Sequence, residues 1–165
     1  DTASNKIIRV AGNPYHPLTT GNPAGSNGRG MSCDGEYYWQ SNSTGLMRFT
    51  PGGAGTSFPD MAPNQISGVT VVPGDDPSHT YVMVTTYNTD IFVLYEYDGS
   101  GMTQVATGVT PSSLGVNSRL GLCWCNARNS LFFSYDTSSG YRISELSFQV
   151  VSLSRDTWAG IKNSF

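Results

Sequence analysis

Charged residues are scarce in this 165-residue chain. Asp, Glu, Lys and Arg together make up 13% of it, about half of what is usual in soluble domains. The nine Lys and Arg are spread singly, and the formal net charge is −3. Because no basic stripe is available to neutralise phosphates, we expect no nucleic acid as a partner. Gly, Ser, Thr and Asn fill the polar positions instead, a composition that favours an extracellular or virion-surface protein.

Long apolar runs and helical periodicity are also missing. No stretch approaches the ~18 apolar residues of a membrane-spanning helix, so we expect no membrane insertion. The first residues, DTASNK, lack both Met and the pattern of a signal segment, and we expect a processed chain or an excised domain. Only the last residues, SRDTWAGIKNSF, have the cap and spacing of a helical turn.

Cysteine is rare as well, with Cys33, Cys123 and Cys125. Cys123 and Cys125 are two residues apart in a predicted strand, so they face the same side and do not easily bond each other. Metal sites usually contain C-x₂-C pairs, which are absent. We expect buried free thiols, with a bridge from Cys33 to one of the other two as the alternative.

Strand patterns fill most of what remains, and three segments share one plan. They begin at Gly30, Gly68 and Gly121, which are 38 and 53 residues apart. Each starts with Gly and a hydrophobic residue, and continues with a polar turn, an aromatic-rich strand, a second turn and a strand of alternating hydrophobic residues. This plan resembles the blade of a β-propeller, a four-stranded antiparallel meander repeated every ~40–50 residues.

The resemblance implies an all-β fold of antiparallel, propeller-like four-stranded meanders. A β-sandwich or jelly roll is the alternative, because it also contains many short strands. We expect one β domain, in which residues 1–29 form a strand and an extended arm, residues 30–151 the three meanders, and residues 152–165 a tail. Within it, residues 51–65 are expected to be a loop and residues 149–153 a closing strand.

Three blades do not close a ring, because propellers contain about four to eight. The open edges would have to be covered, either by copies of the same chain or by the rest of a larger one. We therefore expect a propeller completed by oligomerisation, as a homo-oligomer that is a dimer or a trimer.

The stretch SCDGEYYW is similar to the Asp box of sialidase-type propellers, S-x-D-x-G-x-x-W. Ser32, Asp34 and Trp39 match the pattern, whereas Gly35 lies one place early. In that family the box is a structural turn away from the active site. The similarity therefore implies a fold and not an activity.

Catalytic patterns are lacking. His16 and His79 lie in polar loops, and the chain has no G-x-S-x-G, no phosphate-binding G-x-x-x-x-G-K and no H-E-x-x-H. Three of the twelve acidic residues are Glu, and no spacing marks a glycosidase pair. We therefore predict that the chain is not an enzyme.

Loop residues with oxygen ligands are candidates for a structural Ca²⁺, which takes carboxylate, amide and carbonyl oxygens. None follows the EF-hand order, and turn chemistry is the simpler explanation, because Asp and Asn side chains bond the local backbone. The candidate metal ligands are Asp75, Asp76, Asn88, Asp90 and Asp98.

Tyrosines at strand ends and in loops are the candidate ligand-binding residues. A tyrosine beside amides and hydroxyls can stack on a sugar ring or contact a protein at low entropic cost, although ordinary half-buried tyrosine is the alternative. The candidates are Tyr15, Tyr87, Tyr135 and Tyr141. Aromatic and aliphatic residues inside the strands, such as Trp39, Phe92 and Phe133, are expected in the core.

Taken together, the features look like the receptor-binding head of a viral or phage spike. That resemblance implies a non-enzymatic module that attaches to a host-surface receptor, a glycan or an outer-membrane component, at the virion surface or outside the cell. Two other functions stay open, namely a fragment of a propeller-type glycosidase or lyase, and a structural coat domain.

Overall fold

The computed structural model describes residues 7–11, 16–21, 29–41, 45–50, 54–59, 61 and 65–147. Almost all of its regular structure is β-strand, with one short 3₁₀ helix at Ser112–Leu114. The expected all-β fold of antiparallel meanders is confirmed. Within the described ranges there is no helix with the length and apolarity that a membrane span requires.

Apart from one two-stranded hairpin, the described strands form three antiparallel sheets, and each keeps the order of its strands in the sequence. Blade 1 consists of β3 (Met31–Cys33), β4 (Tyr38–Ser41), β5 (Leu46–Phe49) and β6 (Gly55–Phe58). Blade 2 consists of β7 (Ile66–Val72), β8 (Thr80–Thr86), β9 (Ile91–Tyr97) and β10 (Met102–Val109). Blade 3 consists of β11 (Ser118–Cys125), β12 (Ser130–Thr137) and β13 (Gly140–Leu146). A separate hairpin pairs β1 (Ile7–Ala11) with β2 (His16–Gly21).

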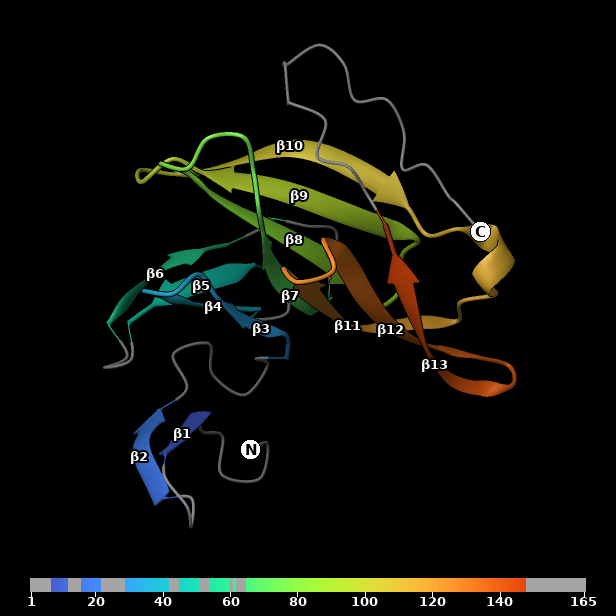
Figure 1. Cartoon of the computed structure of the whole chain (residues 1–165), viewed down its shortest axis with the longest axis horizontal. Coiled ribbons are helices and arrows are strands. Elements are labelled where there is room, and N and C mark those ends of the chain that lie inside the picture. Colours follow the sequence, from blue (N-terminus) through green and yellow to red (C-terminus); the bar gives the residue numbers. More distant parts are fainter. Residues whose placement is uncertain are drawn as a thin grey trace.

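The first strand of each blade lies in the middle of the molecule (Figure 1). There β7 contacts β3 on one side and β11 on the other, whereas β6, β10 and β13 lie on the outside. Blades that radiate from their first strands are the arrangement of a propeller. This arrangement favours the propeller-like prediction over the sandwich.

Two hydrophobic clusters fill the spaces between the blades. The cluster between blades 1 and 2 contains Trp39, Leu46, Ile66, Val69, Val82, Val84, Val93 and Tyr95. The cluster between blades 2 and 3 contains Val72, Tyr81, Met83, Phe92, Leu94, Leu131, Phe133 and Tyr135. Side chains alternate between the two faces of a strand, so β8 sends Tyr81 and Met83 to one cluster and Val82 and Val84 to the other. The core positions expected for Trp39, Phe92 and Phe133 are confirmed.

Glycines at the blade starts let neighbouring innermost strands approach closely. A Cβ atom on Gly30 would lie 2.6 Å from the backbone nitrogen of Val69. One on Gly68 would lie 2.9 Å from the backbone nitrogen of Leu122. Real Cβ atoms do not come this close to backbone, so only glycine fits at the start of blades 1 and 2.

Hydroxyl side chains two residues after these glycines join the blades. Oγ of Ser32 accepts a hydrogen bond from the backbone N–H of Val71, at 3.0 Å. In the same way Oγ1 of Thr70 accepts one from the N–H of Trp124, at 2.9 Å. The contact from blade 1 to blade 2 and the contact from blade 2 to blade 3 therefore follow one pattern, which we call the blade joint.

The stretch similar to an Asp box forms a structural turn between β3 and β4. Oδ1 of Asp34 accepts hydrogen bonds from the backbone N–H groups of Tyr37 and Glu36, at 2.7 and 3.0 Å. Its Oδ2 accepts one from the indole N–H of Trp39, at 2.7 Å. This carboxylate ties the turn to a core side chain, as the resemblance implied.

Several local expectations need correction. Part of the expected extended arm forms the strand β2, which pairs with β1, and the expected loop at 51–65 contains β6. The three cysteines are free, but Cys33 and Cys123 are exposed rather than buried. They lie on strand faces that no described blade covers. The expected strand at 149–153 and the helical turn of the tail lie outside the described residues.

Candidate functional site

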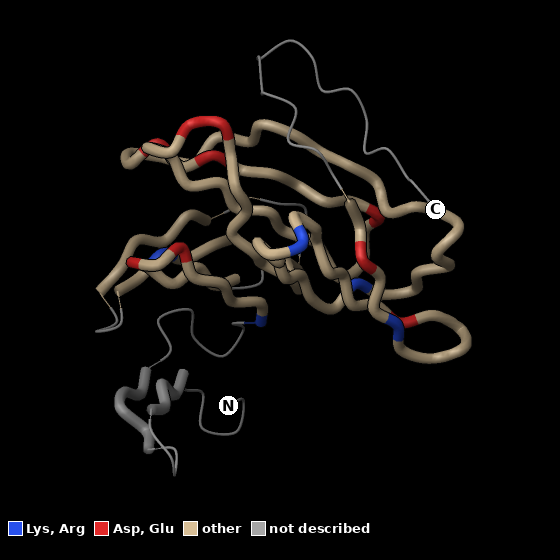
Figure 2. The backbone as a smooth tube through the Cα atoms, in the orientation of Figure 1, with Lys and Arg blue, Asp and Glu red and all other residues tan. Residues whose placement is uncertain are grey.

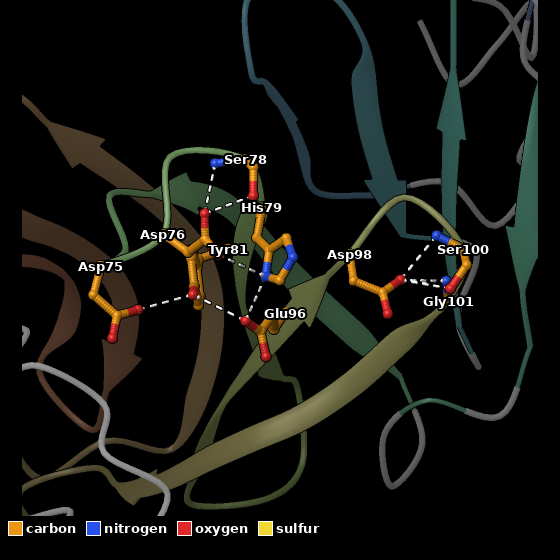
Figure 3. A network of polar contacts seen from close by, with 9 residues as sticks. All are labelled: Asp75, Asp76, Ser78, His79, Tyr81, Glu96, Asp98, Ser100 and Gly101. Atoms are coloured by element: carbon orange, nitrogen blue, oxygen red, sulfur yellow. Dashed lines mark hydrogen bonds and ion pairs between the residues drawn. The ribbon is translucent and has the colours of Figure 1, made fainter.

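A network of polar side chains lies at one end of blade 2 (Figure 3). The network joins the loop between β7 and β8 to the end of β9. These two segments are neighbours because β8 and β9 pair in a register that places Tyr81 opposite Glu96. Figure 2 shows the acidic segments of this loop and of the end of β9 close together. Its central members are Asp75, Asp76, His79, Tyr81 and Glu96.

His79 is held by two carboxylates. Its Nδ1 lies 2.8 Å from Oε1 of Glu96 and 3.8 Å from Oδ2 of Asp76. The hydrogen bond to Glu96 raises the pKa of His79 above its ordinary 6.5; partial burial opposes this, and the negative charges of Asp76, Glu96 and Asp98 add to it. The side chain is 28% exposed. Within the described residues its other nitrogen, Nε2, takes part in no hydrogen bond.

Tyr81 lies between Asp75 and Glu96, the second of which also holds His79. Its buried hydroxyl lies 2.9 Å from Oδ1 of Asp75 and 3.0 Å from Oε1 of Glu96, so it can donate to either. Burial, with these two acceptors, raises the pKa of Tyr81 well above its ordinary value. The hydroxyl therefore stays protonated and acts as a donor, and it does not supply a phenolate nucleophile.

Asp76 and Asp98, at the same end of blade 2, each stabilise the turn in which they lie. Oδ1 of Asp76 accepts hydrogen bonds from the backbone N–H and the hydroxyl of Ser78, at 2.8 and 2.6 Å, which lower the pKa of Asp76. Oδ1 of Asp98 accepts the backbone N–H groups of Ser100 and Gly101, at 2.8 and 2.9 Å. These bonds, with one from the Ser100 hydroxyl, lower the pKa of Asp98 to about 2. Both carboxylates are thus ionised acceptors that bond the local backbone.

The five candidate metal ligands do not come together as one site. Asp75, Asp76 and Asp98 lie at the end of blade 2 that carries the network, whereas Asn88 and Asp90 lie in the turn between β8 and β9. In the part of the chain that the structure describes, no three His, Cys, Asp or Glu side chains are grouped as a metal site. A structural Ca²⁺ stays a prediction.

Asp90 forms an ion pair with Arg119 instead. Arg119 comes from β11, so this pair links blades 2 and 3, and its guanidinium also donates to Oγ1 of Thr110 and to the carbonyl of Asn117, both at 3.4 Å. Burial lowers the pKa of Arg119, but an arginine stays charged. The sequence offered no signal for this contact, which depends on how two blades meet.

The candidate tyrosines have different surroundings. Tyr135 is only 4% exposed, and its hydroxyl lies 2.8 Å from Oγ of Ser144. It is a core residue between blades 2 and 3, which corrects its assignment to a surface ligand site. Tyr87 is half-buried with the guanidinium of Arg29 5.9 Å from its ring centre, and Tyr141 is 78% exposed. Tyr15 lies outside the described residues, as do the side-chain contacts of His16.

A solved structure of similar fold is a propeller-type sugar dehydrogenase. The PQQ-bound form of an aldose sugar dehydrogenase from Streptomyces coelicolor matches with a TM-score of 0.52 and 14% identity, over 86% of this chain and 48% of that chain. A streptogramin B lyase structure matches with a TM-score of 0.30 and 12% identity, over 90% of this chain and 61% of that chain. The chain has a propeller-like fold. No family model and no curated protein matches the sequence.

These comparisons correct the function expected from the sequence. The prediction that the chain is not an enzyme is contradicted, because the aldose sugar dehydrogenase that shares its fold is an enzyme. They give no support to a viral spike, and they fit the alternative of a propeller-enzyme fragment at least as well. The chain spans about half of the dehydrogenase chain.

Proposed function

We propose that the chain is part of a propeller-type enzyme that removes a proton from a carbohydrate, with His79 as the general base. The observation that carries this proposal is the 2.8 Å contact between Nδ1 of His79 and Oε1 of Glu96. A carboxylate on Nδ1 holds the proton there, orients the ring and stabilises the imidazolium that forms when Nε2 takes up a proton. The partly exposed ring leaves Nε2 accessible to a substrate.

Carbohydrate is the proposed substrate class for two reasons. The similar dehydrogenase is named for an aldose sugar. In addition, the groups around His79 are ionised carboxylates and hydroxyls, as in Asp76 with Ser78, and such groups pair well with sugar hydroxyls.

Proton removal is better supported than glycoside hydrolysis. A glycosidase needs a free gap between two carboxyl groups, in which the glycosidic bond or a water molecule lies. Here the hydroxyl of Tyr81 lies between Asp75 and Glu96 and bonds both. A lyase-type elimination begins instead with transfer of a carbon-bound proton to one base, and the electron pair left behind expels the glycosidic oxygen. An oxidation begins with transfer of a hydroxyl proton to one base, while the hydride from the same carbon passes to a redox cofactor or an added electron acceptor. In both reactions His79 can accept the proton on Nε2.

The test measures the turnover of two probe substrates by the full chain. Polygalacturonate reports elimination through the ultraviolet absorbance of the unsaturated product, and an aldose with an artificial dye reports oxidation. His79→Gln should lower kcat by roughly 10²–10⁴-fold, the usual contribution of a general base. Thr107→Ala, at an exposed position toward the other end of blade 2, should leave kcat unchanged. Turnover of neither probe by the wild type, or full activity of His79→Gln, would contradict the proposal.

A further inference from the structure

On blade 3, the positions that would form a blade joint with a following blade contact no further blade among the described residues. We number the residues of each blade from its first glycine, which is residue 0. In a blade joint, residue 0 of one blade lies against the backbone of the next blade. The side chain of residue 2 accepts a hydrogen bond from the backbone N–H of residue 3 of the next blade. On blade 3 these positions are Gly121 and Cys123. A Cβ atom on Gly121 would meet only Oγ of Ser134, at 3.0 Å and within blade 3 itself. Among the described residues, no further backbone lies against Gly121 as it does against Gly30 and Gly68.

This free side of blade 3 carries exposed apolar side chains. Tyr141 and Ile143 of β13 are 78% and 73% exposed. They pair with Asp136 and Ser134 of β12, which alternate with the residues of β12 that fill the core. Tyr141 and Ile143 therefore lie on the face that points away from blade 2. Neighbouring exposed apolar side chains of this size are typical of a surface that another protein surface covers.

Blade 1 has a complementary free side at its innermost strand. Gly30, just before β3, and Ser32 within it face blade 2, so Met31 and Cys33 face the opposite way. Met31 is 46% exposed, and Cys33 is also exposed. Further out on the same face Phe49 is already buried, so the accessible part lies at β3. Cys33 is residue 3 of blade 1, which is the position that receives residue 2 of a preceding blade.

We propose that a second copy of this chain completes the ring, with the free side of blade 3 packed on β3 of the second copy. Two copies supply six blades, whereas three would supply nine, which exceeds the about four to eight of known propellers. The two free sides differ, so the contact is head-to-tail, and a two-fold pair of chains makes it twice and closes. The sugar dehydrogenase chain, of which this chain covers 48%, has the length for two such sets of blades.

The proposal places two thiols together. In both existing joints residue 2 of one blade contacts residue 3 of the next, at 3.0 and 2.9 Å. In the proposed joint these residues are Cys123 of one copy and Cys33 of the second copy. Both are free and exposed in the single chain, so a short bismaleimide can report their proximity.

The experiment cross-links three proteins that all carry Cys125→Ser, and a mixture of two of them. The protein with both remaining thiols should give a covalent dimer, and Cys33→Ser or Cys123→Ser alone should give none. An equimolar mixture of the two single variants should restore the dimer, because a head-to-tail joint still brings Cys123 of one variant to Cys33 of the other. A dimer from either single variant alone would mean a symmetric contact and would overturn the proposal.

A second variant keeps the proposal falsifiable without touching the thiols. Gly121→Ala should abolish the cross-link. At a dilution where the parent chain is also monomeric, it should leave the melting temperature nearly unchanged, because the added methyl group meets no backbone inside one chain. Gly101→Ala, with nothing within 4 Å of the added atom, is the matched control and should cross-link normally. Absence of any cross-link in the parent protein would assign the free sides to other blades of a longer chain or to another protein, and would overturn the proposal. None of these outcomes depends on whether His79 is a base.

Discussion

At the scale of single residues, the carboxylate of Asp34 accepts three hydrogen bonds, which a pattern of hydrophobicity does not predict. It bonds two backbone N–H groups and the indole of the fully buried Trp39. Asp34→Ala leaves that buried indole N–H without its partner, so we expect the free energy of unfolding to fall by about 1–3 kcal/mol. Urea denaturation measures it. Asp34→Asn, which keeps an acceptor oxygen, should lose less; equal losses for both variants would contradict the assigned role of this side chain.

The pair of His79 and Glu96 is predicted to respond to pH. Its hydrogen bond raises the pKa of His79 in the folded chain above the ordinary 6.5. The stabilisation is therefore fully present below pH 6.5 and is lost as the pH rises through the folded pKa. An NMR titration should give a His79 midpoint above 6.5, and Glu96→Gln should move it down. In the enzyme assay, Glu96→Gln should move the acid limb of the rate profile to lower pH. A midpoint that Glu96→Gln leaves unchanged would contradict the pairing.

Part of the site was accessible from the sequence and part was not. Tyr81 and Glu96 are cross-strand partners in the hairpin of β8 and β9, so pairing the two predicted strands about their turn would have brought His79 near Glu96. The sequence pattern alone places His79 in a polar loop, because it does not show the strand register that brings the loop to Glu96. The contact of Arg119 with Asp90 joins two blades, and no local pattern encodes how far apart two blades lie.

At the scale of elements, the repeated glycines were visible in the sequence, but their reason was not. Gly68 lies where β7 meets β11, and an added Cβ atom would lie 2.9 Å from the nitrogen of Leu122 and 3.0 Å from the carbonyl carbon of Gly121. Gly68→Ala should therefore lower the free energy of unfolding by about 1–3 kcal/mol, the usual cost of overpacking. Gly101→Ala, in which the added Cβ atom has nothing within 4 Å, is the control in the same denaturation experiment. A Gly68→Ala variant as stable as the wild type would contradict the close approach of the two strands.

The strand β6, where the sequence pattern indicated a loop, lacks a buried face. β6 (Gly55–Phe58) is exposed except at Phe58, so it lacks the alternation of a half-buried strand. It lies among Gly and Pro residues, which favoured a loop. The outer strand of a blade packs against little, and its sequence is weakly constrained for that reason. By contrast, β8 and β9 are buried on both faces and were evident as continuous hydrophobic runs.

At the scale of the whole molecule, three blades joined through their innermost strands leave two dissimilar sides free. The central claim is that these sides meet in a pair of chains and close a six-bladed ring. The most direct test is the mass of the full chain in solution by light scattering, over a range of concentrations. The account predicts about 35 kDa, twice the 17.7 kDa of one chain. A mass that stays at 17.7 kDa at all concentrations, or one that corresponds to three chains, would contradict it.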